Sequence, residues 1–289
     1  METRPASRIQ CHYHPVAPRR LLERIQLQRP NPRGTLFSPP LIGGSGLLAI
    51  RQLRQLARSD YNLVSFSYAG HGRSTPPFSL QASLRDTDYM FDLAARDSRS
   101  ARLPLFGVGL CYGSIPMLSA AHKACPGIRG IVLINALPRL FSFNLVRSIA
   151  DEYRSIRRVE MEKDYFRRMW QRYIDRLLPQ IDKGFSKFGA LKRHHIRLWK
   201  TLWEAITRNP LRTVRLEHTP VLSIYSPDDP LLGAYRLFHD DGAYERCIRR
   251  ICPRATFVVL KGDHFLSSRE DRGLARQAIL RFLEQTVSA

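Results

Sequence analysis

The stretch Gly109-Leu110-Cys111-Tyr112-Gly113 constrains the fold of this chain more than any other sequence feature. The apolar run at residues 103–108 predicts a short buried strand, and the run at 114–121 predicts a helix that tolerates Pro116 in its first turn. A sharp strand-to-helix turn strains its central residue, and glycines on both sides leave room for the strand and helix to close. The helix N-terminus favours a thiolate at Cys111. The stretch therefore predicts a strained turn that presents a reactive cysteine; the alternative is a small buried thiol without a chemical role.

Four further segments follow predicted strands in a fixed order along the chain. They are residues 39–46 after 35–38, residues 68–74 after 62–66, residues 226–230 after 220–225, and residues 262–265 after 255–260. With the cysteine turn, they resemble the α/β-hydrolase family, whose nucleophile elbow is G-x-S-x-G and whose triad runs in the order nucleophile, acid, histidine. The resemblance covers the chain from about Arg20 to the C-terminus. It implies the α/β-hydrolase fold, a mostly parallel central sheet flanked by helices, with a helical lid inserted after strand 6.

Carried over onto this sequence, the family pattern implies a catalytic triad of Cys111, Asp229 and His264. Aligning Ser226 with the glycine of the family's G-x-x-D turn selects Asp229, and Asp228 is the alternative acid. A cysteine in place of the serine is similar to what dienelactone hydrolases and polyhydroxyalkanoate synthases use. His264 is expected to take the proton of the Cys111 thiol, or to form an imidazolium–thiolate pair with it, while the acid orients the imidazole.

The loop after the third predicted strand is expected to stabilise the oxyanion of a reacting acyl group. Pro40-Leu41 replaces the family's usual His-Gly, and Pro40 has no N–H to donate. We expect the oxyanion hole to consist of the backbone N–H groups of Tyr112 and Ile42, with Leu41 as the alternative loop donor. Leu41 and Trp170 are further expected to contact the substrate, Trp170 from the helical insertion.

The sequence divides into three parts. Residues 1–18 lack the apolar run of a signal peptide and predict a loose N-terminal arm, while residues 19–138 and 216–289 predict the hydrolase core. Residues 139–215 carry apolar side chains at three- and four-residue steps, which is helical periodicity, and they occupy the place of the family's lid. Residues 139–217, which include this insertion, hold 19 Lys and Arg against 9 Asp and Glu. The aromatic side chains of the insertion either pack the lid onto the core or line an apolar tunnel for an acyl chain.

Charge restricts the class of partner. The chain of 289 residues carries 46 Lys and Arg against 25 Asp and Glu, a net charge of +21. This charge fits an anionic acyl carrier, either coenzyme A or acyl carrier protein, and it also fits peripheral contact with an anionic membrane surface. Because the basic residues are spread along the whole chain and no nucleic-acid-binding motif is recognised, we expect no specific nucleic-acid partner.

Residue types also restrict the compartment and the cofactors. The five cysteines are irregularly spaced, which favours free thiols in a reducing, cytoplasmic compartment over disulfides or a metal site. No apolar run is long enough to predict a transmembrane helix. The sequence holds no nucleotide, flavin or metal motif, so we expect no cofactor.

The cysteine decides which acyl donors are favourable. Exchange between two thioesters is close to balanced in free energy, whereas expelling an amine to form a thioester is uphill. We therefore expect an acyl hydrolase or acyltransferase that acts on an acyl thioester or activated ester through an acyl-cysteine intermediate. One alternative is a small-molecule ester or lactone hydrolase of the dienelactone type. The other is a catalytically inactive binding protein with the same fold, against which the intact acid and histidine motifs argue.

Overall fold

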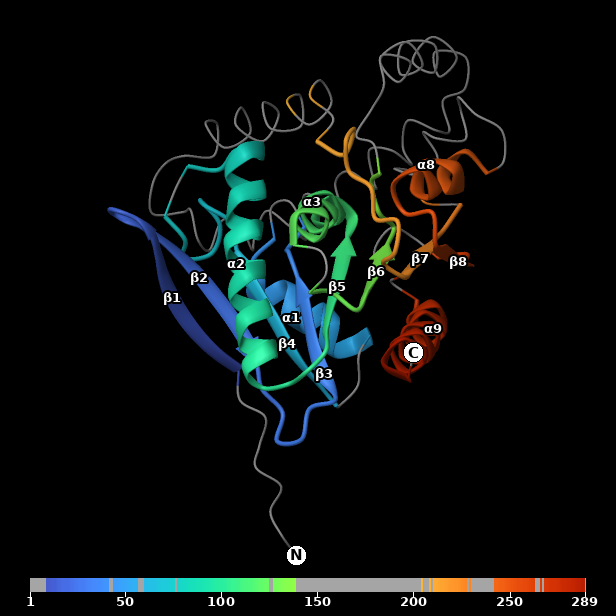
Figure 1. The fold of residues 1–289 in the computed structure, drawn as a ribbon, viewed down its shortest axis with the longest axis horizontal. Coiled ribbons are helices and arrows are strands. Elements are labelled where there is room, and N and C mark those ends of the chain that lie inside the picture. The colour runs from blue at the N-terminus through green and yellow to red at the C-terminus, as the bar shows by residue number, and fades with distance from the viewer. Residues whose placement is uncertain are drawn as a thin grey trace, which may run out of the picture.

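An eight-stranded sheet forms the centre of the molecule, with the strand order β1-β2-β4-β3-β5-β6-β7-β8 (Figure 1). β2 pairs antiparallel with β1 and β4, and all other neighbours pair in parallel. The strands are β1 Ile9–Ala17, β2 Arg20–Leu27, β3 Gly34–Ser38, β4 Tyr61–Ser67, β5 Leu105–Leu110, β6 Gly130–Ile134, β7 Val221–Tyr225 and β8 Ala255–Val259. The structure is a computed structural model that describes residues 9–41, 44–56, 60–75, 77–124, 127–138, 204, 208, 210–227, 229, 242–262, 266 and 268–288.

Helices cover both faces of the sheet, which makes a three-layer architecture (Figure 1). The described helices are α1 Gly46–Leu56, α2 Leu80–Ser100, α3 Ser114–Ala124, α8 Ala243–Ile251 and α9 Arg269–Ser288. α1 and α9 bury apolar side chains such as Ile50 and Ile279 in one core cluster. α2, α3 and α8 contribute to a second cluster, which includes Phe91, Met117 and Ile248. The central strands are therefore covered on both faces, and this is why their sequences read as continuous apolar runs.

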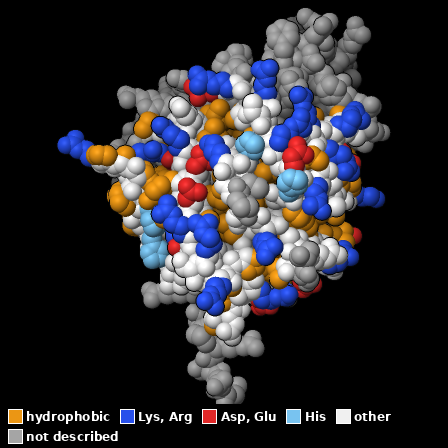
Figure 2. Space-filling view, viewed as in Figure 1, with side chains coloured by type: hydrophobic (Ala, Val, Ile, Leu, Met, Phe, Trp, Pro, Cys, Tyr) orange, Lys and Arg blue, Asp and Glu red, His pale blue; other side chains and the backbone are white. Residues whose placement is uncertain are grey.

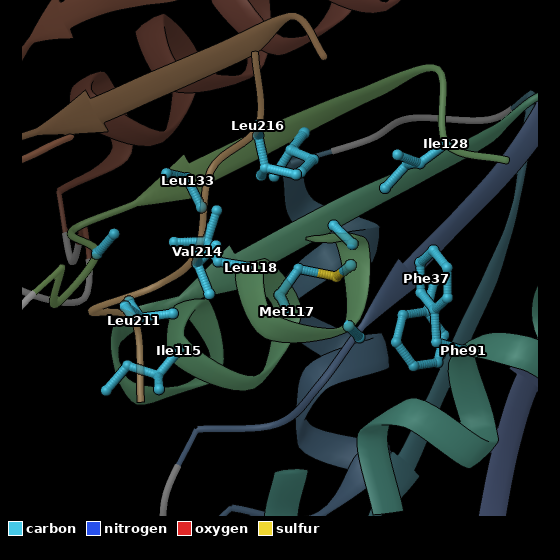
Figure 3. Close-up of a cluster of buried hydrophobic side chains, with 14 of the residues drawn as sticks. Phe37, Phe91, Ile115, Met117, Leu118, Ile128, Leu133, Leu211, Val214 and Leu216 are labelled. Carbon is cyan, nitrogen blue, oxygen red and sulfur yellow. The ribbon is translucent and has the colours of Figure 1, made fainter. Parts of the chain in front are cut away.

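The segment that leads into β7 belongs to the core on the α3 side. Leu211, Val214 and Leu216 are buried there, in the same cluster as Ile115 and Leu118 of α3 (Figure 3). Leu211 and Val214 fall inside the range of residues 139–215 predicted as the lid, and they belong to the same core cluster as α3. Residues 139–203, which hold most of the predicted lid, lie outside the described residues.

Strand positions predicted from apolar runs agree with the sheet. The runs at 35–38, 62–66, 220–225 and 255–260 coincide with β3, β4, β7 and β8 to within a residue at each end, and the run at 103–108 overlaps β5 with an offset of two residues. The prediction of a loose arm over residues 1–18 is wrong for Ile9–Ala17, which forms the edge strand β1. β1 pairs with β2 from Ile9 opposite Leu27 to Ala17 opposite Arg20. Pairing with β2 satisfies its backbone, although its own side chains are mostly exposed.

Candidate active site

Cys111 lies at the junction of β5 and α3, in the short 3₁₀ turn Cys111–Gly113. Its φ of +51° is in the left-handed region, which costs a non-glycine residue about 1–2 kcal/mol. A Cβ on Gly109 would lie 2.6 Å from the Cα of Ser114, and a Cβ on Gly113 would lie 2.7 Å from the carbonyl oxygen of Pro39. Neither position can hold a side chain unless backbone atoms move. The strained turn expected from the glycine spacing is thus present.

The Cys111 thiol is buried, with 4% of the residue exposed, at the N-terminal end of α3. N–H groups in the first turn of a helix have no intrahelical acceptor and create a positive potential at that end, which favours an anion. Tyr112 lies in the 3₁₀ turn directly before α3. Its phenol is also buried and forms a hydrogen bond of 2.8 Å with the hydroxyl of Ser83 on α2. Burial raises the pKa of Tyr112, so its side chain stays a neutral anchor for the turn.

The loop after β3 packs directly against the elbow. The Cβ position of Gly113 faces the carbonyl oxygens of Pro39 and Pro40, at 2.7 and 3.1 Å. Leu41 is 3% exposed and belongs to the same apolar cluster as Cys111. Its carbonyl oxygen accepts the N–H of Gly44 at 2.9 Å. The structure therefore brings the predicted oxyanion loop to the elbow, while Ile42, the predicted loop donor, lies outside the described residues.

Buried polar side chains fasten the neighbouring loops. Glu23 on β2 accepts the hydroxyl of Ser67 at 2.7 Å, and the Ser67 oxygen accepts the N–H of Gly46 at 3.1 Å. Gly46 begins α1, which follows the predicted oxyanion loop. After β4, the ring of Tyr68 meets that of Tyr112 edge-on, with 6.2 Å between centroids. Both loops are thus held beside the elbow by contacts from β2 and β4.

Asp229 lies in the turn after β7, with 0% of the residue exposed. Its N–H donates to the carbonyl oxygen of Ser226 at 3.1 Å, and the N–H of Ser226 donates to Oδ1 of Asn135 at 3.0 Å. Tyr244 on α8 lies nearby: burial raises the pKa of its phenol, and the charge of Asp229 adds to the rise. A buried carboxylate needs compensating partners, and the acid of a catalytic triad is such a group.

Cys111 and Asp229 follow β5 and β7, so β6 lies between their strands. His264, Asp228 and Trp170 lie outside the described residues. In the sequence His264 follows β8, which is the neighbour of β7 in the sheet. Among the residues that the structure describes, no group of three or more His, Cys, Asp and Glu could hold a metal ion. The four cysteines among the described residues are free thiols: Cys11, Cys111, Cys247 and Cys252.

The model of the alpha/beta hydrolase family matches residues 41–277. The chain belongs to this family. No curated protein sequence matches it significantly.

Solved structures of other proteins superpose on nearly the whole chain. A monoglyceride lipase from Saccharomyces cerevisiae has a TM-score of 0.64 at 13% identity, covering 98% of this chain and 97% of that chain. A bromoperoxidase from Bacillus anthracis has a TM-score of 0.62 at 14% identity, covering 95% and 100%. A hydrolase from Pseudomonas aeruginosa has a TM-score of 0.59 at 19% identity, covering 94% and 98%. Identities this low establish the shared fold alone.

Sequence reasoning missed the polar residues that hold the elbow at Cys111 and the turn at Ser226 and Asp229 in place. Ser114 donates to the carbonyl oxygen of Cys111 at 2.6 Å and Asn135 accepts from Ser226, and neither was singled out beforehand. For Asn135 a signal existed, because an Asn directly after a buried strand favours a left-handed turn. Ser114 has no such signal, since serine is common in the first turn of any helix.

Basic side chains are spread over the face of the molecule shown in Figure 2. Figure 2 shows Lys and Arg side chains scattered over the viewed face of the described residues, with acidic side chains between them. None of the described helices is both long and apolar enough to cross a membrane.

Proposed function

We propose that this chain is an acyl hydrolase or acyltransferase that works through a covalent acyl-cysteine intermediate on Cys111. The observation that carries the proposal is the elbow: a cysteine with a φ of +51° before α3, between two glycines that admit no side chain. A strained non-glycine residue persists where the surroundings enforce it, and such residues cluster at functional sites. Membership of the α/β-hydrolase family, in which the nucleophile sits on this turn, supports the same role for Cys111.

In the first half-reaction, His264 takes the proton of Cys111 and the thiolate attacks the acyl carbonyl carbon, which forms a C–S bond. The carbonyl π electrons move to oxygen, and the N–H groups of Tyr112 and of the loop at residues 40–43 stabilise the oxyanion. Collapse of the tetrahedral intermediate breaks the bond to the carrier, which leaves with the proton held by His264. Asp229 orients the imidazole during both transfers.

In the second half-reaction, an acceptor with a hydroxyl, thiol or water oxygen attacks the acyl-cysteine. The acceptor gives its proton to His264 as its oxygen or sulfur bonds to the carbonyl carbon. The C–S bond to Cys111 then breaks, and the cysteine regains the proton from His264. Water as the acceptor makes the protein a hydrolase, and any other acceptor makes it an acyltransferase.

The donor class follows from the intermediate. An acyl-cysteine is a thioester, so forming it from another thioester or an activated ester is close to balanced, whereas forming it from an amide is uphill. The net charge of +21 supports an anionic carrier, coenzyme A or acyl carrier protein, and is compatible with peripheral contact to an anionic membrane. The monoglyceride lipase from yeast and an esterase from Pyrococcus furiosus share this fold, which supports acyl chemistry on it.

A substrate panel tests the proposal. We expect higher kcat/KM for acyl-coenzyme A thioesters than for short p-nitrophenyl esters or lactones. Cys111→Ala should abolish turnover, and Cys111→Ser should retain slow activity because His264 can still act as its base. A preference for the short esters would identify a small-ester hydrolase instead, and turnover that survives in Cys111→Ala would reject the covalent mechanism.

Thiol labelling separates an enzyme from an inactive binding protein of the same fold. In the enzyme, iodoacetamide alkylates Cys111 near neutral pH faster than it alkylates the same cysteine in the denatured chain. A native rate no higher than the denatured rate would favour the binding protein.

A further inference from the structure

The carboxyl ends of β5, β6 and β7 lie level with one another. In the parallel register, Leu110 of β5 lies opposite Ile134 of β6, and Ile134 lies opposite Ile224 of β7. Cys111 and Asn135 are the next residues after the first two. Three segments therefore begin at the same edge of the sheet: the elbow at Cys111, the segment after β6 at residues 135–137 (the β6 exit), and the turn after β7 that holds Ser226 and Asp229 (the acid turn). The β6 exit lies between the other two.

Ser114 joins the exit of β6 to the elbow. Its hydroxyl donates to the carbonyl oxygen of Cys111 at 2.6 Å and accepts the N–H of Leu137 at 3.1 Å. Ser114 is 0% exposed, and Cys111 and Leu137 are 4% and 7% exposed. Because a buried polar group left without a partner is costly, these two hydrogen bonds keep the elbow and the β6 exit in a fixed arrangement.

Asn135 joins the same exit to the acid turn. Its Oδ1 accepts the N–H of Ser226 at 3.0 Å, and its backbone N–H donates to the carbonyl oxygen of Ile224 at 2.8 Å. The carbonyl oxygen of Ser226 accepts the N–H of Asp229 at 3.1 Å. Asn135, Ser226 and Asp229 are all 0% exposed. Buried hydrogen bonds on both sides of the β6 exit thus tie it to the elbow carbonyl and to the backbone of the proposed acid.

We propose that Ser114 and Asn135 are positioning residues, which together form a clamp that sets the separation of Cys111 from Asp229. The inference rests on the proposed function, in which the sulfur and the carboxylate act on opposite sides of one imidazole. A displacement of about 1 Å in such a site can cost about 10²-fold in rate. The β6 exit can prevent such a displacement, because it forms hydrogen bonds with Ser114 beside the elbow and with Ser226 in the acid turn.

The backbone of Asn135 allows a sharp choice of variants. Its φ is +43°, in the left-handed region that glycine adopts freely. Asn135→Gly removes Oδ1 but tolerates the backbone conformation, whereas Asn135→Ala removes Oδ1 and adds strain. Ser114→Ala removes the other half of the clamp. Ile279→Val on α9 is the control for a small loss of stability, because Ile279 is buried in the cluster on the opposite face of the sheet.

Native-state amide hydrogen exchange tests the clamp without any substrate. Asn135→Gly should speed exchange of the Ser226 N–H by about tenfold or more, and Ser114→Ala should do the same for Leu137, since each amide loses a buried acceptor. Asn135→Ala should match Asn135→Gly at Ser226 while being less stable overall. Ile279→Val should leave both amides slow. If the Ser226 and Leu137 amides of the clamp variants exchanged as slowly as those of the wild type, the proposal would be overturned.

Steady-state kinetics tests the positioning role. In Asn135→Gly and Ser114→Ala, kcat should fall about tenfold or more while KM stays within about twofold, because the transition state is affected and substrate binding is not. Ile279→Val should keep the wild-type kcat. Faster exchange with an unchanged kcat would leave only a structural role and would overturn the proposal. If the wild-type protein turns over no acyl substrate, the proposed function fails, and the exchange rates still decide whether the clamp exists.

Discussion

Substituting alanine for an elbow glycine should destabilise the protein through a backbone clash. In Gly109→Ala the new Cβ would lie 2.6 Å from the Cα of Ser114, whereas carbon atoms in contact are ordinarily about 3.5–4.0 Å apart. The Ser114 Cα is a backbone atom at the start of α3, and the new Cβ is bonded directly to the backbone near the end of β5, so no flexible side chain can move aside. Overpacking of this kind costs about 1–3 kcal/mol.

Gly273→Ala is the matched control, since it makes the same chemical change at an open position. A Cβ at Gly273 would meet nothing within 4 Å, and the residue lies within α9. Alanine is favoured over glycine in a helix by about 1 kcal/mol, so this variant should be more stable than the wild type. The two substitutions should therefore differ in sign, by about 2–4 kcal/mol in the free energy of unfolding.

Thermal unfolding of the three proteins side by side measures this difference. For a chain of this size, 1 kcal/mol shifts Tm by about 2–4 °C, so Gly109→Ala should lower Tm by several degrees and Gly273→Ala should raise it by about 2–4 °C. If Gly109→Ala unfolded within a degree of the wild type, the strand and helix would not close as tightly as the structure has them, and the steric reasoning for the elbow would be refuted.

Three further predictions follow from buried or strained groups. Burial, with the charge of Arg24, lowers the pKa of His14 below 6.5, so unfolding takes up a proton and stability falls as pH drops through 6.5; Tm against pH should be flatter in His14→Gln. Gly72 has a φ of +54°, so Gly72→Ala should lower the free energy of unfolding by about 1–2 kcal/mol in urea denaturation, and an unchanged urea midpoint would contradict this. Tyr112→Phe breaks the buried bond to Ser83 and should cost about 1 kcal/mol by chemical denaturation; a neutral result would mean that the hydroxyl pair does not anchor the elbow.

Features with a local signal could be predicted from the sequence. β6, Gly130–Ile134, is buried along its whole length, and a strand covered on both faces reads as an unbroken apolar run. The spacing of Gly109 and Gly113 around Cys111 predicted the strained turn, because only a residue without a side chain fits at either glycine. The order of the motifs along the chain predicted which strands carry them.

Features that depend on distant partners could not be predicted. β1 contains His12, His14 and Pro15 and has no clean apolar alternation, so its strand conformation follows from pairing with β2. The role of Asn135 depends on Ser226, which is 91 positions away in the chain. The apolar character of Leu211 and Val214 is visible in the sequence, but the sequence carries no information on the element that covers them.

Intact-mass spectrometry after incubation with an acyl thioester tests the proposed covalent step most directly. We predict that an acid-quenched sample of the wild-type protein gains the mass of one acyl group and that Cys111→Ala gains none. A digest of the wild-type sample should locate the group on the peptide that contains Cys111. His264→Ala should form the adduct far more slowly. A wild-type protein that stays unmodified across a panel of acyl chain lengths, or an adduct that persists in Cys111→Ala, would contradict the assignment of Cys111 as the nucleophile.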